Sequence, residues 1–167
     1  MTRLAIYLFK ERILDGMTIR KATIEDISVI SLLWLEMVKE LAPDYNPRRD
    51  WWEIMAKKMF SSGLYNLFVA GNEGFILGFI DFFTWPEPAT GEIHAVGQHF
   101  YCLPAYRKTS IPGKLYKRAI NSAKKQNCSY IELCCFENEK PMWIKKGFLP
   151  LRSIVRRPIC LTQSLQR

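Results

Sequence analysis

Apolar side chains recur at helical spacing in the first part of the chain and give way to strand-like runs after residue 64. The first periodic stretch predicts a helix over about residues 24–41, and Thr23 and Asp26 have the spacing of a capping box at its start. Its apolar face consists of Ile27, Ile30, Trp34, Val38 and Leu41. Asn46 followed by Pro47 predicts the cap and first position of a second helix. The apolar face of that helix consists of Trp52, Met55, Met59 and Phe60.

Strand-like runs dominate the middle of the chain. YNLFVA (65–70) and FILGFIDFF (75–83) are separated by the turn formers GNEG, which predicts a hairpin. A long strand is expected over 93–103, followed by an amphipathic helix that begins at Ile111 and has a basic outer face. The continuous apolar run YIELCCF (130–136) is typical of a strand buried on both sides.

The last elements are a short helix in NEKPMWIKKGF, ended by Gly147, and strand character in LPLRSIVRRPICL. With a short strand over 17–21, the order βααβββαβαβ predicts a mixed α/β domain built on one sheet. We expect this single domain over 17–160, with 1–16 as an N-terminal extension and 161–167 as a C-terminal tail.

Composition narrows the class of protein. The chain has 167 residues, of which 49% are hydrophobic, and this argues against disorder. We expect no membrane span and no signal peptide, because apolar runs are short and no cleavage site follows the first one. The five cysteines show no CxxC pair and the two histidines have no finger spacing, so we expect reduced thiols, a cytoplasmic location and no metal.

Charge is distributed unevenly along the chain. Residues 104–167 contain 14 lysines and arginines against 3 acidic residues, whereas residues 1–103 contain 10 against 13. The C-terminal part should therefore attract anions. The charge alone leaves a nucleotide cofactor, a nucleic acid or an acidic protein as partners. No helix-turn-helix or aromatic RNA-binding strand motif is present, so a sequence-specific DNA reader has little support and a nucleic acid is not the expected partner.

The stretch PAYRKTSIPGKL has the features of a phosphate site at the start of a helix, where backbone N–H groups are unpaired. Arg107, Lys108 and Lys114 add positive charge there, and Ser110 can cap the helix. Pro112 removes one donor without breaking the helix, because proline is tolerated in a first turn.

These features resemble the GNAT superfamily of N-acetyltransferases over roughly 17–160, through AYRKTSIPGKL after one strand and NEKPMWIKKGF after the next. The resemblance implies a single α/β domain with a mixed sheet of about six to seven strands and about four helices. It also implies acetyl-CoA as acyl donor. Ser110 and Pro112 stand where the family has glycines. The implied cofactor-binding residues are Tyr101, Cys102, Leu103, Arg107, Lys108, Thr109, Ser110, Ile111, Pro112, Gly113, Asn138 and Trp143.

Acetyl transfer to an amine needs a base, a polarised thioester and stabilisation of the leaving thiolate. Val96 occupies the position where some family members carry a glutamate base. His94, which shares its face, is our first candidate, and Glu92 and His99 follow; His99 faces the other way unless a bulge reverses the strand. Each has the alternative of a solvated or hydrogen-bonded structural residue. Trp143 replaces a tyrosine general acid and could bond the departing sulfur or only pack.

The acceptor site is expected between the first two helices and in the loop TWPEPATGE. Its candidate residues are Asp44, Tyr45 and Trp85, and Asp81 as an acidic wall. We therefore expect an N-acetyltransferase that acts on a primary amine of a small molecule or protein, as a monomer or homodimer. The alternative is a catalytically impaired GNAT-like binding or assembly protein that uses its basic C-terminal part.

Overall fold

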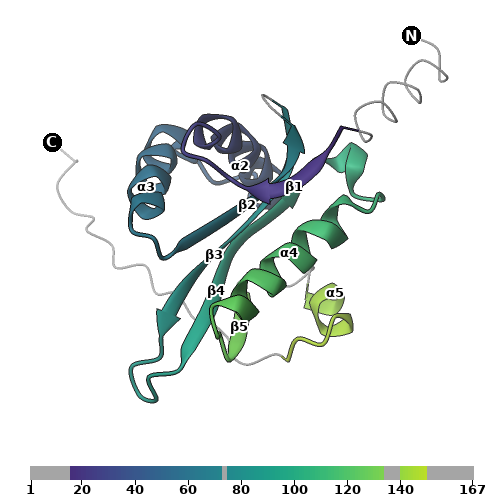
Figure 1. Cartoon of the computed structure of the whole chain (residues 1–167). Helices are drawn as coiled ribbons and strands as arrows, with labels where there is room; N and C mark the ends of the chain where they lie inside the picture. The colour runs from purple at the N-terminus through teal and green to yellow at the C-terminus, as the bar shows by residue number, and fades with distance from the viewer. Residues whose placement is uncertain (1–15, 73–74, 134–139, 150–167) are drawn as a thin grey trace, which may run out of the picture. The chain divides into compact units, whose positions relative to one another are not determined.

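The computed structural model of the protein describes residues 16–72, 75–133 and 140–149 (Figure 1). The chain divides into two compact units, residues 1–134 and 135–167, and each is described by itself. The second unit contains α5 (Lys140–Lys145), and Gly147 with φ 90° follows it, as expected. The first unit contains β1 (Thr18–Lys21), α2 (Ile27–Leu41), α3 (Arg49–Ser61), β2 (Tyr65–Asn72), β3 (Phe75–Pro86), β4 (Ile93–Cys102), the 3-10 helix η1 (Pro104–Tyr106), α4 (Ile111–Lys125) and β5 (Tyr130–Leu133).

One mixed sheet forms the centre of the first unit, with strand order β1-β2-β3-β4-β5. The first four strands are antiparallel neighbours, and β5 runs parallel to β4. The expected hairpin and long strand are confirmed. The described residues contain five strands, fewer than the six to seven expected, and the predicted closing strand lies almost entirely outside them.

Helices cover both faces of this sheet (Figure 1). The helices α2 and α3 pack on one face, in a core that includes Ile30, Trp52, Leu67 and Phe79. The helix α4 packs on the other, in a core that includes Leu115, Ala119, Phe68, Leu77 and Ile80. The period-two alternation of β2 and β3 distributes their side chains between these two cores.

Both N-terminal helices begin later than predicted. Helix α2 begins at Ile27 instead of residue 24. In the turn before it, the Asp26 carboxylate accepts the N–H of Thr23 at 2.8 Å and pairs with Arg20 at 2.6 and 2.8 Å. Helix α3 begins at Arg49, so the cap predicted at Asn46 is wrong. Arg48 is still extended, with φ −96° and ψ 94°, and the buried face of the helix begins only at Trp52.

The strand β5 is more exposed than predicted. Tyr130 is exposed and the next three residues are half-buried, so the expectation of burial on both faces is wrong for 130–133. Within the described sheet β5 is the outermost strand, and an edge strand needs fewer apolar side chains. In the part of the chain that the structure describes, no helix is long and apolar enough to cross a membrane.

Candidate active site

A β-bulge in β4 determines which side chains reach the face covered by α2 and α3. Phe82 of β3 pairs with Gly97, but Ile80, two residues earlier, pairs with Phe100, three residues later. The strand β4 therefore contains one extra residue at this point. An extra residue reverses the alternation of side chains beyond it.

The reversal is visible in the two cores. Ala95, before the bulge, lies in the α4 core, whereas Tyr101, after it, lies in the core of α2 and α3. His99 therefore shares a face with His94 and Val96, which is the orientation expected for it if a bulge reversed the strand.

His99 is bound to the carboxylate of Asp81 on this face. Nδ1 of His99 lies 2.8 Å from Oδ2 of Asp81, and the backbone N–H of His99 donates to Oδ1 at 2.7 Å. The hydroxyl of Tyr65 also donates to Oδ2, at 2.5 Å. Asp81 is only 1% exposed, so three donors replace the water around its carboxylate.

Trp34 of α2 fixes the other ring nitrogen. Its Nε1–H donates to Nε2 of His99 at 3.3 Å, and its ring stacks on Trp52 of α3 at 5.4 Å between centroids. An indole N–H can only donate, so Nε2 accepts and the proton of neutral His99 is on Nδ1, facing Asp81. The imidazole is held in one orientation and one tautomer from both ends.

The charge of Asp81 raises the proton affinity of its neighbours. Burial lowers the pKa of His99, but the Asp81 charge and hydrogen bond outweigh it, so this pKa lies above the ordinary value. Burial, together with the same carboxylate, raises the pKa of Tyr65 far above its usual range, so Tyr65 remains a donor. The network is thus a carboxylate, a histidine and two neutral donors.

Arg107 directly follows η1, in the loop between β4 and α4, and binds α2. Both of its terminal nitrogens donate to the carboxylate of Glu40 at 2.6 Å, and its Nε donates to the carbonyl of Cys102 at 2.9 Å. Hydrogen bonds from Arg107 lower the pKa of Glu40, although burial opposes them. The guanidinium also lies over the Tyr101 ring, 5.3 Å from its centroid. Arg107 therefore fastens the loop to α2.

The start of α4 presents unpaired backbone donors. Among the described residues, no acceptor is present for the N–H groups of Lys108, Ser110 and Gly113. A Cβ added at Gly113 would meet nothing within 4 Å, so the space beside this residue is open. Ser110 makes no capping bond; instead the Thr109 hydroxyl accepts the N–H of Ile111 at 3.3 Å. The capping role predicted for Ser110 is therefore wrong.

A depression of about 230 Å³ adjoins this helix start. It is lined by Met17, Ile19, Thr109, Ser110, Ile111 and Lys114. Pro112 is the second residue of α4 and has no N–H to offer. Open amides, a helix N-terminus and lysines together make a site that suits a pyrophosphate.

The sequence model of the Acetyltransferase (GNAT) family matches residues 27–143, well over half of the chain. The chain belongs to the GNAT acetyltransferase family. No curated protein matches it.

Solved GNAT-like structures share the fold at low identity. A predicted acetyltransferase with acetyl-CoA from Clostridium acetobutylicum has a TM-score of 0.73 and 19% identity, covering 86% of this chain and 96% of that chain. A possible acetyltransferase from Clostridium difficile 630 has a TM-score of 0.73 and 15% identity, covering 87% and 99%. Ribosomal-protein-alanine N-acetyltransferase from Brucella melitensis biovar Abortus 2308 has a TM-score of 0.63 and 19% identity, covering 84% of this chain and 98% of that chain.

His94 and Glu92 lie near the start of β4, far from the loop that joins β4 to α4. His94 is buried, with Nδ1 2.9 Å from the Tyr130 hydroxyl and 3.7 Å from Glu87. It precedes His99 by five residues, about 16 Å along a strand. Glu92 is exposed beside it. Both histidines therefore have a carboxylate nearby, but it is His99 that lies within hydrogen-bond distance of one, at 2.8 Å from Asp81, and that also contacts α2.

The residues predicted for the acceptor site are dispersed. Asp44 and Tyr45 are exposed between α2 and α3, and Trp85 is 53% exposed near the end of β3. Asp81 does not form an acidic wall, because it is buried behind His99 and its carboxylate oxygens accept hydrogen bonds from the protein. The expectation for Asp81 as a substrate contact is therefore replaced by a role in holding His99.

Two predicted cofactor residues belong to the second unit. Asn138 lies outside the described residues. Trp143 is buried, and its ring packs edge-on against Phe148 at 5.4 Å. In the first unit, burial raises the pKa of the Cys102 thiol to about 11, which argues against a cysteine nucleophile. Across the described ranges, no group of three His, Cys, Asp or Glu residues could hold a metal.

Sequence reasoning missed Trp34, Tyr65 and Glu40 as parts of the site. Trp34 fitted the apolar stripe of α2, and Tyr65 fitted the apolar run of β2. Their polar atoms were the available signal, because a buried indole N–H or phenol usually has a hydrogen-bond partner. Nothing in the local sequence pairs Glu40 with Arg107, which is 67 residues away.

The raised pKa of His99 predicts a pH-dependent stability. A raised folded-state pKa contributes stability that is complete below the ordinary histidine pKa of about 6.5 and disappears as pH rises through the folded pKa. We expect the free energy of unfolding to decline over this interval, by at most about 1.4 kcal/mol per pH unit for one proton. Urea unfolding from about pH 5.5 to 9 measures it, with His99→Gln as the comparison. An identical decline in that variant would contradict the assignment.

Proposed function

We propose that this GNAT protein transfers an acetyl group from acetyl-CoA to a primary amine of a small molecule or protein. The observation that supports it best is His99, held by Asp81 on the α2 and α3 face of the bulged strand. The family match supports the reaction class. Free thiols at Cys102 and Cys128 support a reducing compartment such as the cytoplasm.

In this proposal His99 is the acceptor for the amine proton. A primary amine is largely protonated at neutral pH and must lose a proton before it attacks a thioester carbonyl. Nε2 of His99 is the acceptor, and Asp81 stabilises the imidazolium that results. The Trp34 N–H must leave Nε2 first, because a protonated Nε2 would face another donor. His99 keeps 24% of its side chain exposed, which leaves access from solvent.

The loop and helix start fit the donor's pyrophosphate. When bound, acetyl-CoA supplies the thioester, and its carbonyl is the electrophile. The amides of Lys108, Ser110 and Gly113 and the side chain of Lys114 are placed to bind phosphate oxygens. Arg107, already bound by Glu40, contributes by fixing the loop. The backbone from Tyr101 to Leu103 remains the proposed contact for the pantetheine arm.

Gly113→Ala separates cofactor binding from folding. Alanine is favoured over glycine in a helix by roughly 0.8–1.0 kcal/mol, and the added Cβ meets no protein atom within 4 Å. We therefore expect a protein at least as stable as the parent that binds acetyl-CoA about tenfold more weakly, because the methyl group obstructs the amides. Calorimetric titration and thermal unfolding of the same samples measure both effects. Unchanged affinity would place the pyrophosphate elsewhere.

The proposed function is tested by thiol release from acetyl-CoA with a panel of primary amines that includes an N-terminal alanine peptide, a polyamine and an aminoglycoside. Amine-dependent release with saturable acetyl-CoA binding is expected. Absence of binding at millimolar acetyl-CoA would overturn the proposal. Binding without release for any amine would favour the alternative, a GNAT-like binding protein, to which the basic outer face of α4 lends support.

A further inference from the structure

The charged side chains on the outer face of α4 are all positive. Its cations occupy positions i, i+3, i+4, i+10 and i+11 of the helix, which spreads them over the exposed arc of the helix, away from the buried face. All five side chains are exposed, and they are Lys114, Lys117, Arg118, Lys124 and Lys125. We call this set the α4 basic face.

The charge of the α4 basic face is not neutralised locally. No acidic residue occurs between Glu92 and Glu132 in the sequence. Within the part of the chain that the structure describes, none of the five cations forms an ion pair. Lys124 and Lys125 suit the C-terminal end of a helix, but Lys114 opposes the dipole and has like-charged neighbours at i+3 and i+4. Helix stability alone does not account for this arrangement.

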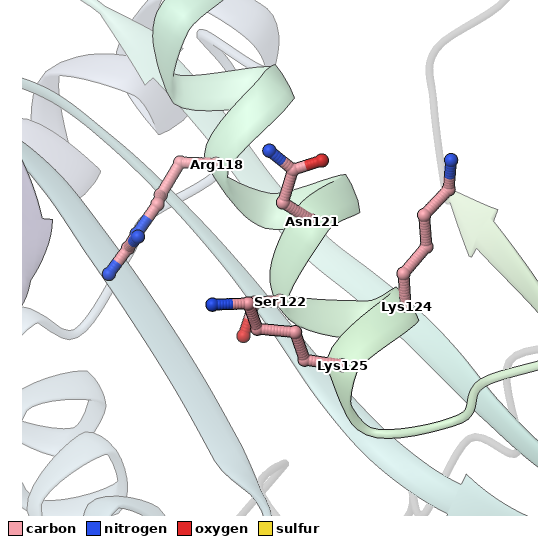
Figure 2. Close-up of a pocket in the computed structure, with 5 residues that line it drawn as sticks. All are labelled: Arg118, Asn121, Ser122, Lys124 and Lys125. Atoms are coloured by element: carbon pink, nitrogen blue, oxygen red, sulfur yellow. The ribbon is translucent and has the colours of Figure 1, made fainter.

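The surface at the second half of α4 is hollowed. A depression of about 360 Å³ is lined by Arg118, Asn121, Ser122, Lys124 and Lys125. Figure 2 shows Arg118 and Lys124 extending from different sides of the helix, with Asn121 between them. The Arg118 guanidinium lies 5.6 Å from the centre of the Phe68 ring, which restrains it. The cations are therefore spread over a broad surface instead of closing around one small ion.

This surface fits an extended polyphosphate better than a folded protein. Protein interfaces have an apolar centre and few lysines, whereas the centre of the α4 basic face is Asn121. Lys114 and Lys125 are separated by about 16 Å along the helix axis. Duplex DNA carries one negative charge per about 1.7 Å of its length, so several phosphates can lie within reach of these side chains.

We propose that the α4 basic face binds the phosphate backbone of a nucleic acid without reading its sequence. This revises the expectation of no nucleic-acid partner, which depended on missing base-reading motifs; phosphate contacts need none. The α4 basic face and the Asp81–His99 pair lie on opposite faces of the sheet. Lys114, at the start of α4, belongs to both proposed sites, whereas Lys117 and Lys124 belong only to the α4 basic face. Replacing Lys117 and Lys124 therefore lets the two proposals fail separately.

The test is fluorescence anisotropy of a labelled mixed-sequence 20-bp DNA duplex, titrated with the full chain at several salt concentrations. The double variant Lys117→Gln/Lys124→Gln should weaken binding at least tenfold at low salt. Each lost phosphate contact lowers the slope of log K against log salt by about 0.9, so the loss of two should lower it by about 2. The control Lys21→Gln/Lys58→Gln makes the same change of charge at exposed sites on β1 and α3 and should bind like the parent. Both double variants should bind acetyl-CoA like the parent.

Several outcomes would overturn the proposal. These are no duplex binding at 50 mM salt, equal weakening in both double variants, and a tenfold preference for one duplex sequence. Preference for poly-glutamate over the duplex would assign the face to an acidic protein segment instead. Circular dichroism of each variant confirms that α4 is retained, and glutamine is a good helix former at exposed positions.

Discussion

His99→Gln is expected to lower kcat/KM for acetyl transfer by roughly 10²–10⁴-fold, the usual contribution of a positioned general base. Glutamine can still donate to Asp81, so the network keeps a partner, but it cannot accept a proton at neutral pH. The activity of the parent should rise with pH through the raised pKa of His99. The variant should lose this limb of the pH profile, which a purely structural role for His99 would leave in place.

His94→Gln in the same assay separates the two histidines. His94 lies beside Tyr130 and Glu87 near the start of β4, so its replacement should preserve most of the activity. A large loss in this variant, with activity kept in His99→Gln, would reverse the assignment. Trp34→Phe gives a further measurement: without the indole N–H on Nε2, the pKa of His99, followed by NMR, should rise further. No change in that pKa would show that Trp34 does not restrain the ring.

The sequence predicted the main helices and strands because burial of one face determines both the spacing of apolar residues and the packing of each element. Helical and strand periods in Ile27–Leu41 and Phe75–Pro86 record which side faces a core, and the structure confirms both elements. The position of the bulge could not be predicted, because the residues before it and the residues after it each alternate between the two faces as in a regular strand. That single residue reverses the facing of His99, so it also decided which histidine meets Asp81.

Motif resemblance identified the loop but not the partners of its side chains. Arg107 was expected at a pyrophosphate, yet Glu40 of α2 holds both of its terminal nitrogens. Ser110 was expected to cap α4, yet Thr109 does so from one position earlier. Both differences arise from tertiary contacts or loop geometry, which spacing along a chain does not encode. The helix start itself, set by Ile111 and tolerant of Pro112, was predictable from local rules.

Asp81→Ala is expected to lower the free energy of unfolding by about 3–5 kcal/mol, the scale for breaking a buried charged pair. Three donors, from Tyr65 and from the backbone and ring of His99, would lose their acceptor in a site that water does not reach. Asp81→Asn keeps the shape and separates stability from chemistry. Its amide would donate to Nδ1 of His99, forcing the proton to Nε2, where it would meet the Trp34 N–H. We expect a loss of kcat of roughly 10²–10⁴-fold in the folded variant.

Urea unfolding and steady-state kinetics on the same samples distinguish these effects. Tyr65→Phe is the matched comparison for stability, because it removes one of the three donors to Asp81 and leaves the carboxylate on His99. It should cost about 1.5–3 kcal/mol, less than Asp81→Ala. If Asp81→Asn folds and turns over substrate like the parent, the tautomer of His99 has no bearing on the reaction. The carboxylate would then be a structural acceptor alone, and the base would have to be sought among water or other groups on the same face.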